Sequence, residues 1–199
     1  MNGVGRNQLR IIGGAWRGRK LAFPPLPGLR PTPDRVRETL FNWLQNIIPG
    51  ARCLDLYAGS GALGFEALSR GAAEAVMVDR QPPVIAQLRQ HSVTLRADGA
   101  HFVLADAQEF LRQVPTRPFD IVFLDPPFSD NVVGSCFERL AEPGWLAPAA
   151  WIYVEAARAT PLPALPAGWE LFRHKQAGQV GYHLLKCSAP LTRPERTAP

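Results

Sequence analysis

The chain has 199 residues, of which 46% are hydrophobic and 20% charged, a composition that fits one globular α/β domain with a small appendage. No apolar run approaches the roughly 20 residues of a membrane span, and no apolar stretch follows the basic N-terminus, so we expect a cytosolic protein. Cys53, Cys136 and Cys187 lack the spacing of a disulfide framework or a zinc site, and the four histidines lack ligand spacing. We therefore expect no membrane anchor and no metal.

The net charge of +5 is concentrated at the N-terminus. Residues 1–37 contain eight Arg or Lys residues and one acid, whereas residues 38–199 contain 14 Arg or Lys residues and 16 acids. A cluster of cations of this kind is typical of a surface that binds phosphate groups, as in nucleic acids. The alternative is a solvated basic tail with no partner.

The first predicted element is a β-hairpin, with strands at residues 9–12 and 19–23 around the glycine-rich stretch 13–18. Trp16 lies near its tip among Arg17, Arg19 and Lys20. An aromatic ring between cations suits RNA, because the ring can stack on an unpaired base while the cations hold phosphates. A Trp16 side chain folded back onto the domain is the competing interpretation.

A proline-rich linker, residues 24–33, leads to a predicted helix over residues 33–44. We expect Thr32 to cap its N-terminus and Pro33 to occupy its first position. Its apolar residues recur at helical spacing and predict a buried stripe: Val36, Leu40, Trp43, Leu44 and Ile47. Arg35 and Arg37 lie off this stripe, so we expect both to be free to meet a polar ligand or RNA.

A predicted strand at residues 53–57 is followed by a glycine-rich loop at residues 58–64 and a helix at residues 65–70. Gly59, Gly61 and Gly64 satisfy the GxGxxG pattern of dinucleotide sites, so a nicotinamide-dependent oxidoreductase has to be considered. Asp55 points to another ligand. A carboxylate at this strand end would face a pyrophosphate unfavourably but could bind the cationic amino-acid end of S-adenosylmethionine.

Three further strands are predicted to end in an acid: residues 75–79 in Asp79, residues 102–105 before Asp106, and residues 119–124 before Asp125. A helix is expected at residues 82–95. Ligands of parallel sheets bind at the carboxyl ends of the strands, where Asp79 could meet ribose hydroxyls and Asp106 with Ala107 the adenine edge. Each acid alone could instead cap a helix.

The fourth of these acids opens the tetrapeptide Asp125-Pro126-Pro127-Phe128. Two prolines fix the backbone in a stiff turn and remove two N–H donors, which leaves the Asp125 side chain and the Pro126 carbonyl as acceptors. Together with the flat face of Phe128, this turn could hold the exocyclic amine of a nucleobase. A turn that merely ends the strand is the alternative.

The remaining pattern predicts a helix at residues 131–142, a strand at 152–155 and an antiparallel pair at 169–174 and 180–187. Alternating strands and helices predict a Rossmann-like α/β fold, a mostly parallel seven-stranded sheet with helices on both faces and the small hairpin as an extension. We expect residues 1–33 to form the basic extension and linker, residues 34–187 the main domain, and residues 188–199 a disordered tail.

Five stretches together resemble the bacterial RsmD-type methyltransferases: residues 10–19, 30–38, 54–64, 125–128 and 177–182. The resemblance covers residues 9–187 and implies methyl transfer from S-adenosylmethionine to the N2 amine of a guanine in small-subunit (16S) ribosomal RNA. It implies that the cofactor is held by Asp55, Tyr57, Gly59, Ser60, Gly61, Asp79, Asp106 and Ala107. It implies catalysis by Asp125, Pro126, Pro127 and Phe128. It implies RNA binding by Arg10, Trp16, Arg17, Arg19, Lys20, Arg30 and Arg35.

Three other functions stay open from the sequence: a DNA amino-methyltransferase, the oxidoreductase, and an RNA-binding protein without catalysis. A chain of 199 residues leaves little room for a DNA-reading domain. As partner we expect ribosomal RNA within an assembling small subunit, because a short basic arm offers few contacts of its own. We expect a monomer.

Overall fold

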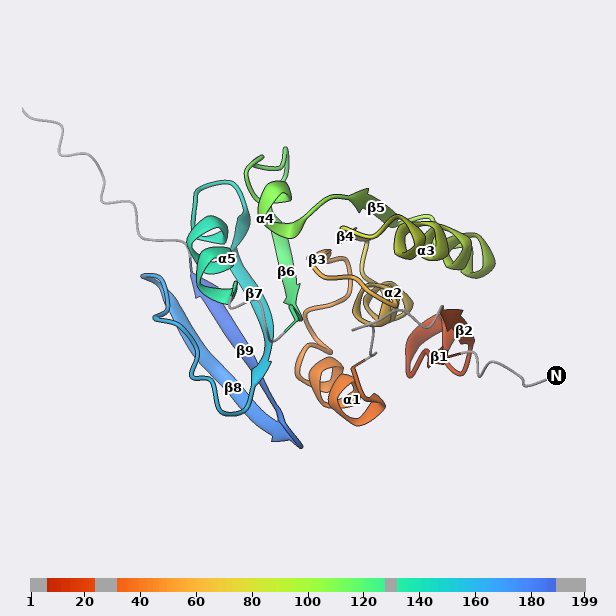
Figure 1. Ribbon diagram of the computed structural model, residues 1–199, viewed down its shortest axis with the longest axis horizontal. Helices are drawn as coiled ribbons and strands as arrows, with labels where there is room; N and C mark the ends of the chain where they lie inside the picture. Colours follow the sequence, from red (N-terminus) through yellow and green to blue (C-terminus); the bar gives the residue numbers. More distant parts are fainter. Residues whose placement is uncertain (1–6, 24–31, 128–131, 189–199) are drawn as a thin grey trace, which may run out of the picture.

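The computed structural model describes residues 7–23, 32–127 and 132–188. Its main element is a seven-stranded sheet with the order β5-β4-β3-β6-β7-β9-β8, flanked by helices (Figure 1). The strands are β3 (Arg52–Asp55), β4 (Glu74–Asp79), β5 (Ala100–Leu104), β6 (Phe119–Leu124), β7 (Leu146–Ala157), β8 (Trp169–Ala177) and β9 (Val180–Ser188). The five strands from β5 to β7 in this order run parallel, and β9 runs antiparallel to both of its neighbours. The predicted fold class is confirmed.

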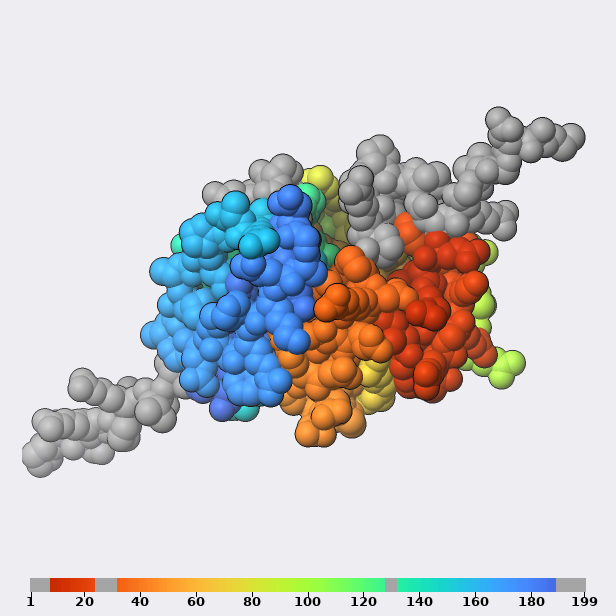
Figure 2. All heavy atoms as spheres, turned by 90° about the horizontal axis from the view of Figure 1, so that it is seen from below, coloured from red at the N-terminus to blue at the C-terminus, as the bar shows by residue number. Residues whose placement is uncertain are grey.

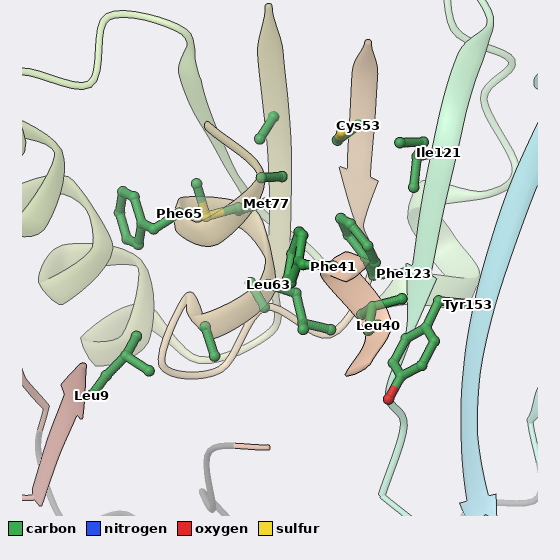
Figure 3. Packing of buried hydrophobic residues seen from close by; sticks show 14 of the residues in the cluster. Leu9, Leu40, Phe41, Cys53, Leu63, Phe65, Met77, Ile121, Phe123 and Tyr153 are labelled. Atoms are coloured by element: carbon green, nitrogen blue, oxygen red, sulfur yellow. The ribbon is translucent and has the colours of Figure 1, made fainter. Parts of the chain in front are cut away.

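Two apolar cores, one on each face, hold the sheet between its helices. Side chains alternate along a strand, so Ile121 and Phe123 of β6 join one core while Val122 and Leu124 join the other. The first core also takes in α1 (Asp34–Trp43), α2 (Ala62–Ser69) and α3 (Pro82–Leu95). Figure 3 shows Phe41 of α1, Phe65 of α2 and Met77 of β4 in this core. The second core is covered by α4 (Ala107–Phe110) and α5 (Val133–Leu140).

The N-terminal hairpin consists of β1 (Asn7–Arg10), the short 3-10 helix η1 (Gly14–Trp16) and β2 (Lys20–Phe23). Leu9 and Leu21 are buried and belong to the same core as α2 and α3. Gly14 has φ +74°, and a Cβ there would lie 1.7 Å from the Ser69 carbonyl oxygen, so the hairpin tip approaches α2 as closely as only glycine permits. Figure 2 shows the hairpin, α1 and the β8–β9 strands side by side on one face.

Two expectations about α1 are wrong. Pro33, not Thr32, is the residue that precedes the helix, and the Thr32 hydroxyl donates to Asp125 Oδ2 (3.3 Å) instead of capping a backbone N–H. Arg37 is not free to meet RNA, because its side chain is only 1% exposed and bonds the Asp34 carboxylate and the carbonyls of Arg10 and Thr32. The apolar stripe does not reveal this, since the hairpin that covers Arg37 comes from elsewhere in the chain.

Several other predicted elements exist with shifted ends. The helix after the glycine loop begins at Ala62 instead of Phe65, the one expected at residues 131–142 spans Val133–Leu140, and the strand expected at 152–155 spans Leu146–Ala157. The α4 helix was not expected. Among the described residues, no helix has both the length and the apolar character needed to cross a membrane.

Candidate active site

Asp55 ends β3 and is the most buried acid at the carboxyl edge of the sheet, with 1% exposure. Its Oδ2 accepts a hydrogen bond from the Gly64 amide (3.1 Å), whereas its Oδ1 is buried without a partner in the described part of the chain. Burial raises the pKa of Asp55 to about 7, the negative charges of Asp125 and Asp79 add to this, and the Gly64 bond, with a weaker contribution from the Tyr57 amide, opposes it. A cationic group beside Oδ1 would stabilise the ionised form.

The glycine loop between β3 and α2 depends on backbone conformations that favour glycine. Gly59 has φ +50° and Gly61 has φ +78°, and a Cβ on Gly61 would lie 2.6 Å from Leu88 and Phe65 side-chain atoms. Gly64 lies within α2, where a Cβ would lie 2.7 Å from Met77 of β4, so this glycine lets the helix pack closely on the sheet. Ser60 in the same loop is buried.

Asp79 ends β4 and binds backbone N–H groups with both of its carboxylate oxygens. Oδ2 accepts from Gly59 (3.0 Å) and Oδ1 from Gln81 (2.9 Å). A carboxylate oxygen has a second lone pair, so these bonds orient Asp79 and leave acceptor capacity for ribose hydroxyls. The structure therefore brings Asp79 against the glycine loop.

Asp106 acts as the N-cap of α4, with its Oδ1 accepting from the Gln108 amide (2.8 Å), which is the helix-capping role considered for each acid. Ala107 is the buried first residue of α4. Tyr57 packs against the second core, and its hydroxyl lies 3.7 Å from Cys136 Sγ. Burial is the main cause that raises the pKa of Tyr57, so it stays a neutral hydroxyl.

Asp125 follows β6, and its turn includes Pro126, which is buried, and Pro127, which is exposed. Burial raises the pKa of Asp125 to about 6, and the hydrogen bond from Thr32 opposes this shift. Phe128 lies outside the described residues. Asp125 thus has one oxygen held by Thr32 and lies near Asp55, whose pKa its charge raises.

Sequence reasoning missed three residues beside Asp125: Thr32, Tyr153 and Glu155. Glu155 is 3% exposed near the end of β7, and the Tyr153 hydroxyl donates to its Oε1 (2.8 Å). Burial raises the pKa of Glu155 to about 8, and the Asp125 charge adds to this shift. The available signal was an acid at the end of an apolar strand, the same signal that identified Asp55, Asp79 and Asp125.

The predicted RNA-binding residues differ in how far they are engaged within the protein. Arg10 pairs with Asp34 (2.9 Å), and Arg19 donates to the Thr94 carbonyl (3.1 Å). Trp16 is half-buried against the first core, as the competing interpretation held. Arg17, Lys20 and Arg35 are exposed and make no ion pair within the described ranges. Arg30 lies outside the described residues.

These contacts would allow one edge of the sheet to bind two kinds of group, a cation and an amine. The Asp55 oxygen that has no partner in the described residues and the glycine loop beside it fit a ligand with a cationic group, such as the amino-acid end of S-adenosylmethionine. Asp125 at the proline turn offers an acceptor to an amine. The described residues contain no group of three His, Cys, Asp or Glu side chains placed to hold a metal ion.

Several solved structures that this chain resembles are titled as methyltransferases. "Putative methyltransferase yhhF from Escherichia coli" superimposes with a TM-score of 0.86 at 48% identity, over 92% of this chain and 100% of that one. An RNA methyltransferase from Salinibacter ruber in complex with S-adenosyl-L-homocysteine has the same fold at 18% identity, with a TM-score of 0.61 over 85% of this chain and 100% of that one. Fold and site together define a Rossmann-like methyltransferase.

The family follows from the sequence relatives. The model described as "Conserved hypothetical protein 95" matches residues 9–186. "Ribosomal RNA small subunit methyltransferase D" of Escherichia coli strain K12 is 52% identical over 188 residues, 94% of each chain, and the protein of the same name from Haemophilus influenzae is 45% identical over 182 residues, covering 90% of this chain and 94% of that one. The chain belongs to this RsmD-type family, which confirms the resemblance seen in its motifs.

Proposed function

We propose that this protein transfers a methyl group from S-adenosylmethionine to the exocyclic N2 amine of a guanine in small-subunit ribosomal RNA. One observation carries the proposal: in a chain of this family, the unpartnered Asp55 oxygen and the Asp125 carboxylate lie near each other at the carboxyl edge of the sheet. The first fits a cationic cofactor, and the second fits an amine. The family match favours neither the oxidoreductase nor the DNA methyltransferase considered from the sequence.

The cofactor would be held by Asp55 at its ammonium group, by Gly59, Ser60 and Gly61 along its length, by Asp79 at the ribose and by Asp106 with Ala107 at the adenine. Tyr57 would complete the pocket wall. When bound, the cofactor would supply an electrophilic methyl group and leave as the thioether S-adenosylhomocysteine, while the methylated amine would release one proton to water. The cofactor's ammonium group would also stabilise the ionised form of Asp55 and so counteract the effect of burial, which raises the pKa of this carboxyl.

The target amine is a poor nucleophile, because its lone pair is delocalised into the guanine ring. Asp125 and the Pro126 carbonyl would accept its two N–H groups, orient the lone pair and stabilise the positive charge that develops on nitrogen. Correct alignment can lower a barrier by about 7 to 11 kcal/mol, so positioning accounts for most of the proposed catalysis. Phe128 would stack on the base and offset part of the cost of unstacking it from the RNA.

Replacing Asp55 by Asn is expected to weaken cofactor binding by more than about ten-fold, the loss of roughly one charge-assisted hydrogen bond. The same change should stabilise the free protein at pH 8. Because the folded pKa of Asp55 lies above the ordinary value of 3.8, the folded state loses stability as pH rises from about 4 towards about 7, and Asn does not ionise. Calorimetric binding at pH 8, with melting temperatures at pH 5 and pH 8, tests both effects.

Asp98→Asn, on an exposed residue, is the control for Asp55→Asn. It should change neither the affinity for the cofactor nor the difference between the two melting temperatures. Unchanged affinity in Asp55→Asn would remove Asp55 from the proposed cofactor site.

The hairpin cations give a separate expectation for RNA binding. Arg17→Ala and Lys20→Ala should each lower the affinity for RNA to a similar extent whatever the RNA sequence, since each removes one phosphate contact. Each should also reduce the slope of log affinity against log salt concentration by about 0.7 to 0.9. Binding to small-subunit RNA measured at several salt concentrations checks this. Arg112→Ala, an exposed cation beside α4, should leave the slope unchanged; equal slopes in all three variants would place the RNA on another surface.

The proposed function is tested by transfer of labelled methyl from S-adenosylmethionine to unmethylated small subunits, naked small-subunit RNA and duplex DNA, followed by nucleoside analysis. Label in N2-methylguanosine is the expected result. A better rate on small subunits than on naked RNA would support the proposal that ribosomal proteins help to present the RNA. Label in a DNA base, or no transfer with cofactor bound, would overturn the proposed substrate.

A further inference from the structure

Glu155 is a buried acid that the mechanism above does not use. Glu155 follows Val154 on β7, and Val154 pairs in register with Leu124 of the parallel strand β6. Because Asp125 follows Leu124, Glu155 and Asp125 come next to each other at the ends of neighbouring strands. Side chains alternate along a strand, and Glu155 therefore lies on the same face as Tyr153 and in register with Tyr182 of β9. Figure 3 shows the Tyr153 ring beside Phe123 and Leu40, with its hydroxyl pointing away from the apolar cluster.

The Thr32 hydroxyl lies within hydrogen-bonding reach of both Glu155 and Asp125. Thr32 is 5% exposed, its carbonyl is held by Arg37 Nε (3.1 Å), and its hydroxyl donates to Asp125 Oδ2 (3.3 Å). A hydroxyl has a single hydrogen. If Glu155 and Asp125 were both ionised, the two carboxylates would compete for that hydrogen, whereas a protonated Glu155 can donate its own hydrogen to the Thr32 oxygen.

The charges around Glu155 favour its neutral form. Burial, followed by the charge of Asp125, raises the pKa of Glu155, and hydrogen bonds from Tyr153 and Thr32 oppose the shift. Tyr182 faces it from β9, while Asp55 adds negative charge beside Asp125. On β8, Lys175 pairs with Tyr182 but is exposed. No Lys, Arg or His in the described ranges forms an ion pair with Glu155, and Arg37 is engaged by Thr32, Asp34 and Arg10.

We propose that Glu155 is a positioning residue for the methyl transfer, which acts as a neutral acid and directs the Thr32 hydroxyl to Asp125 Oδ2. Asp125 Oδ1 is then the oxygen that accepts the target amine. This inference rests on the proposed function of Asp125. Loss of the Glu155 proton places a second negative charge beside Asp125 and restores the competition for Thr32, so the reaction slows as pH rises through the pKa of Glu155.

The pH profile of the rate provides the main test. Wild-type protein should show a loss of rate at acid pH, where Asp125 is protonated, and a second loss near pH 8, where Glu155 ionises. Glu155→Gln keeps an N–H donor for Thr32 but does not ionise, so it should lose the alkaline decline and keep a rate within about three-fold of wild type at pH 7. Glu155→Ala lacks the donor and should lower kcat by about ten-fold or more with an unchanged KM for RNA.

A second readout does not depend on activity. In protein labelled with ¹³C at glutamate side-chain carboxyls, one signal should titrate far above the ordinary glutamate range, and Glu155→Gln should lack that signal. Glu138→Gln, on the exposed side of α5, is the matched control and should leave the high-titrating signal in place. A Glu155 signal in the ordinary range would overturn the proposal, as would an unchanged alkaline decline in Glu155→Gln.

Variants of Thr32 test the same link if changes at Glu155 impair folding. Thr32→Ser keeps the hydroxyl and should preserve the pH profile. Thr32→Val removes the hydrogen bond that lowers the pKa of Asp125, so the acid decline should move to higher pH. An unmoved acid decline in Thr32→Val would also overturn the proposal. Wild-type protein that transfers no methyl to RNA would instead refute the proposed function, while the glutamate titration would still report on Glu155.

Discussion

Replacing Asp125 by Ala is expected to reduce methyl transfer by about a thousand-fold, the upper end of what removing one preorganised polar group from a reacting centre costs. The side chain supplies one of the two proposed acceptors that orient the amine and stabilise its growing charge. Single-turnover rates at saturating cofactor and RNA measure the effect directly. They separate the chemical step from product release.

Cofactor binding distinguishes this loss from a damaged fold. Asp125→Ala should bind S-adenosylmethionine with nearly unchanged affinity, because Asp55 and the glycine loop are left in place. Asp98→Ala, an exposed acid after α3, should keep the full rate and serves as the control. An Asp125→Ala protein that retains more than about a tenth of the rate would exclude Asp125 as the main acceptor.

The buried pair of Arg37 and Glu66 gives the largest expected effect on stability. Their side chains are 1% and 0% exposed, and Arg37 Nη1 lies 3.5 Å from Glu66 Oε2. Glu66 also accepts from the amides of Ile12 and Gly13, both at 2.8 Å, and from Arg70 Nε at 2.7 Å. Arg37 of α1 and Glu66 of α2 therefore attach the hairpin to both helices by hydrogen bonds to backbone groups of the hairpin.

Arg37→Ala is expected to lower the free energy of unfolding by about 3 to 5 kcal/mol, because it removes one partner of a buried ion pair and leaves the carbonyls of Arg10 and Thr32 without their donor. Urea unfolding at pH 7 measures this. Hydrogen exchange should accelerate first at the Ile12 and Gly13 amides, since the hairpin loses its attachment.

Arg35→Ala is the matched control on the same helix, because Arg35 is exposed, and it should change stability by less than about 0.5 kcal/mol. The double variant Arg37→Met with Glu66→Gln should lose less than the sum of the two single changes, because the unpaired charge is removed together with its partner. A loss below about 1 kcal/mol for Arg37→Ala would show that solvent reaches Glu66.

Local patterns were sufficient to predict most of the fold. The β6 strand was predicted with its observed bounds, Phe119–Leu124, because a short continuous apolar run of that length is typical of a strand buried on both faces. The α3 helix was also predicted correctly at Pro82–Leu95, where prolines are accepted only in the first turn. In contrast, α4 has four residues, too few for helical periodicity to be visible.

Contacts between distant segments were not predictable from such patterns. Arg37 looked like an exposed cation, since a charged residue beside an apolar stripe is usually solvated, and only the docking of the hairpin buries it. Thr32 looked like a helix cap, since its position in the sequence fits that role. Its hydroxyl donates to Asp125, 93 residues away, because Thr32, two residues before α1, and the end of β6 meet in the folded chain.

The sequence by itself determined the sheet, the glycine loop and the series of acids at strand ends, because each depends on spacing within a few residues and on the rule that parallel strands end at a common edge. Only the tertiary structure decided what each acid bonds. It left Asp55 Oδ1 without a partner among the described residues, made Asp106 a helix cap and placed Glu155 beside Asp125. Hydrogen-bond partners and desolvation depend on which distant groups the folded chain brings within about 3 Å, and no local pattern specifies them.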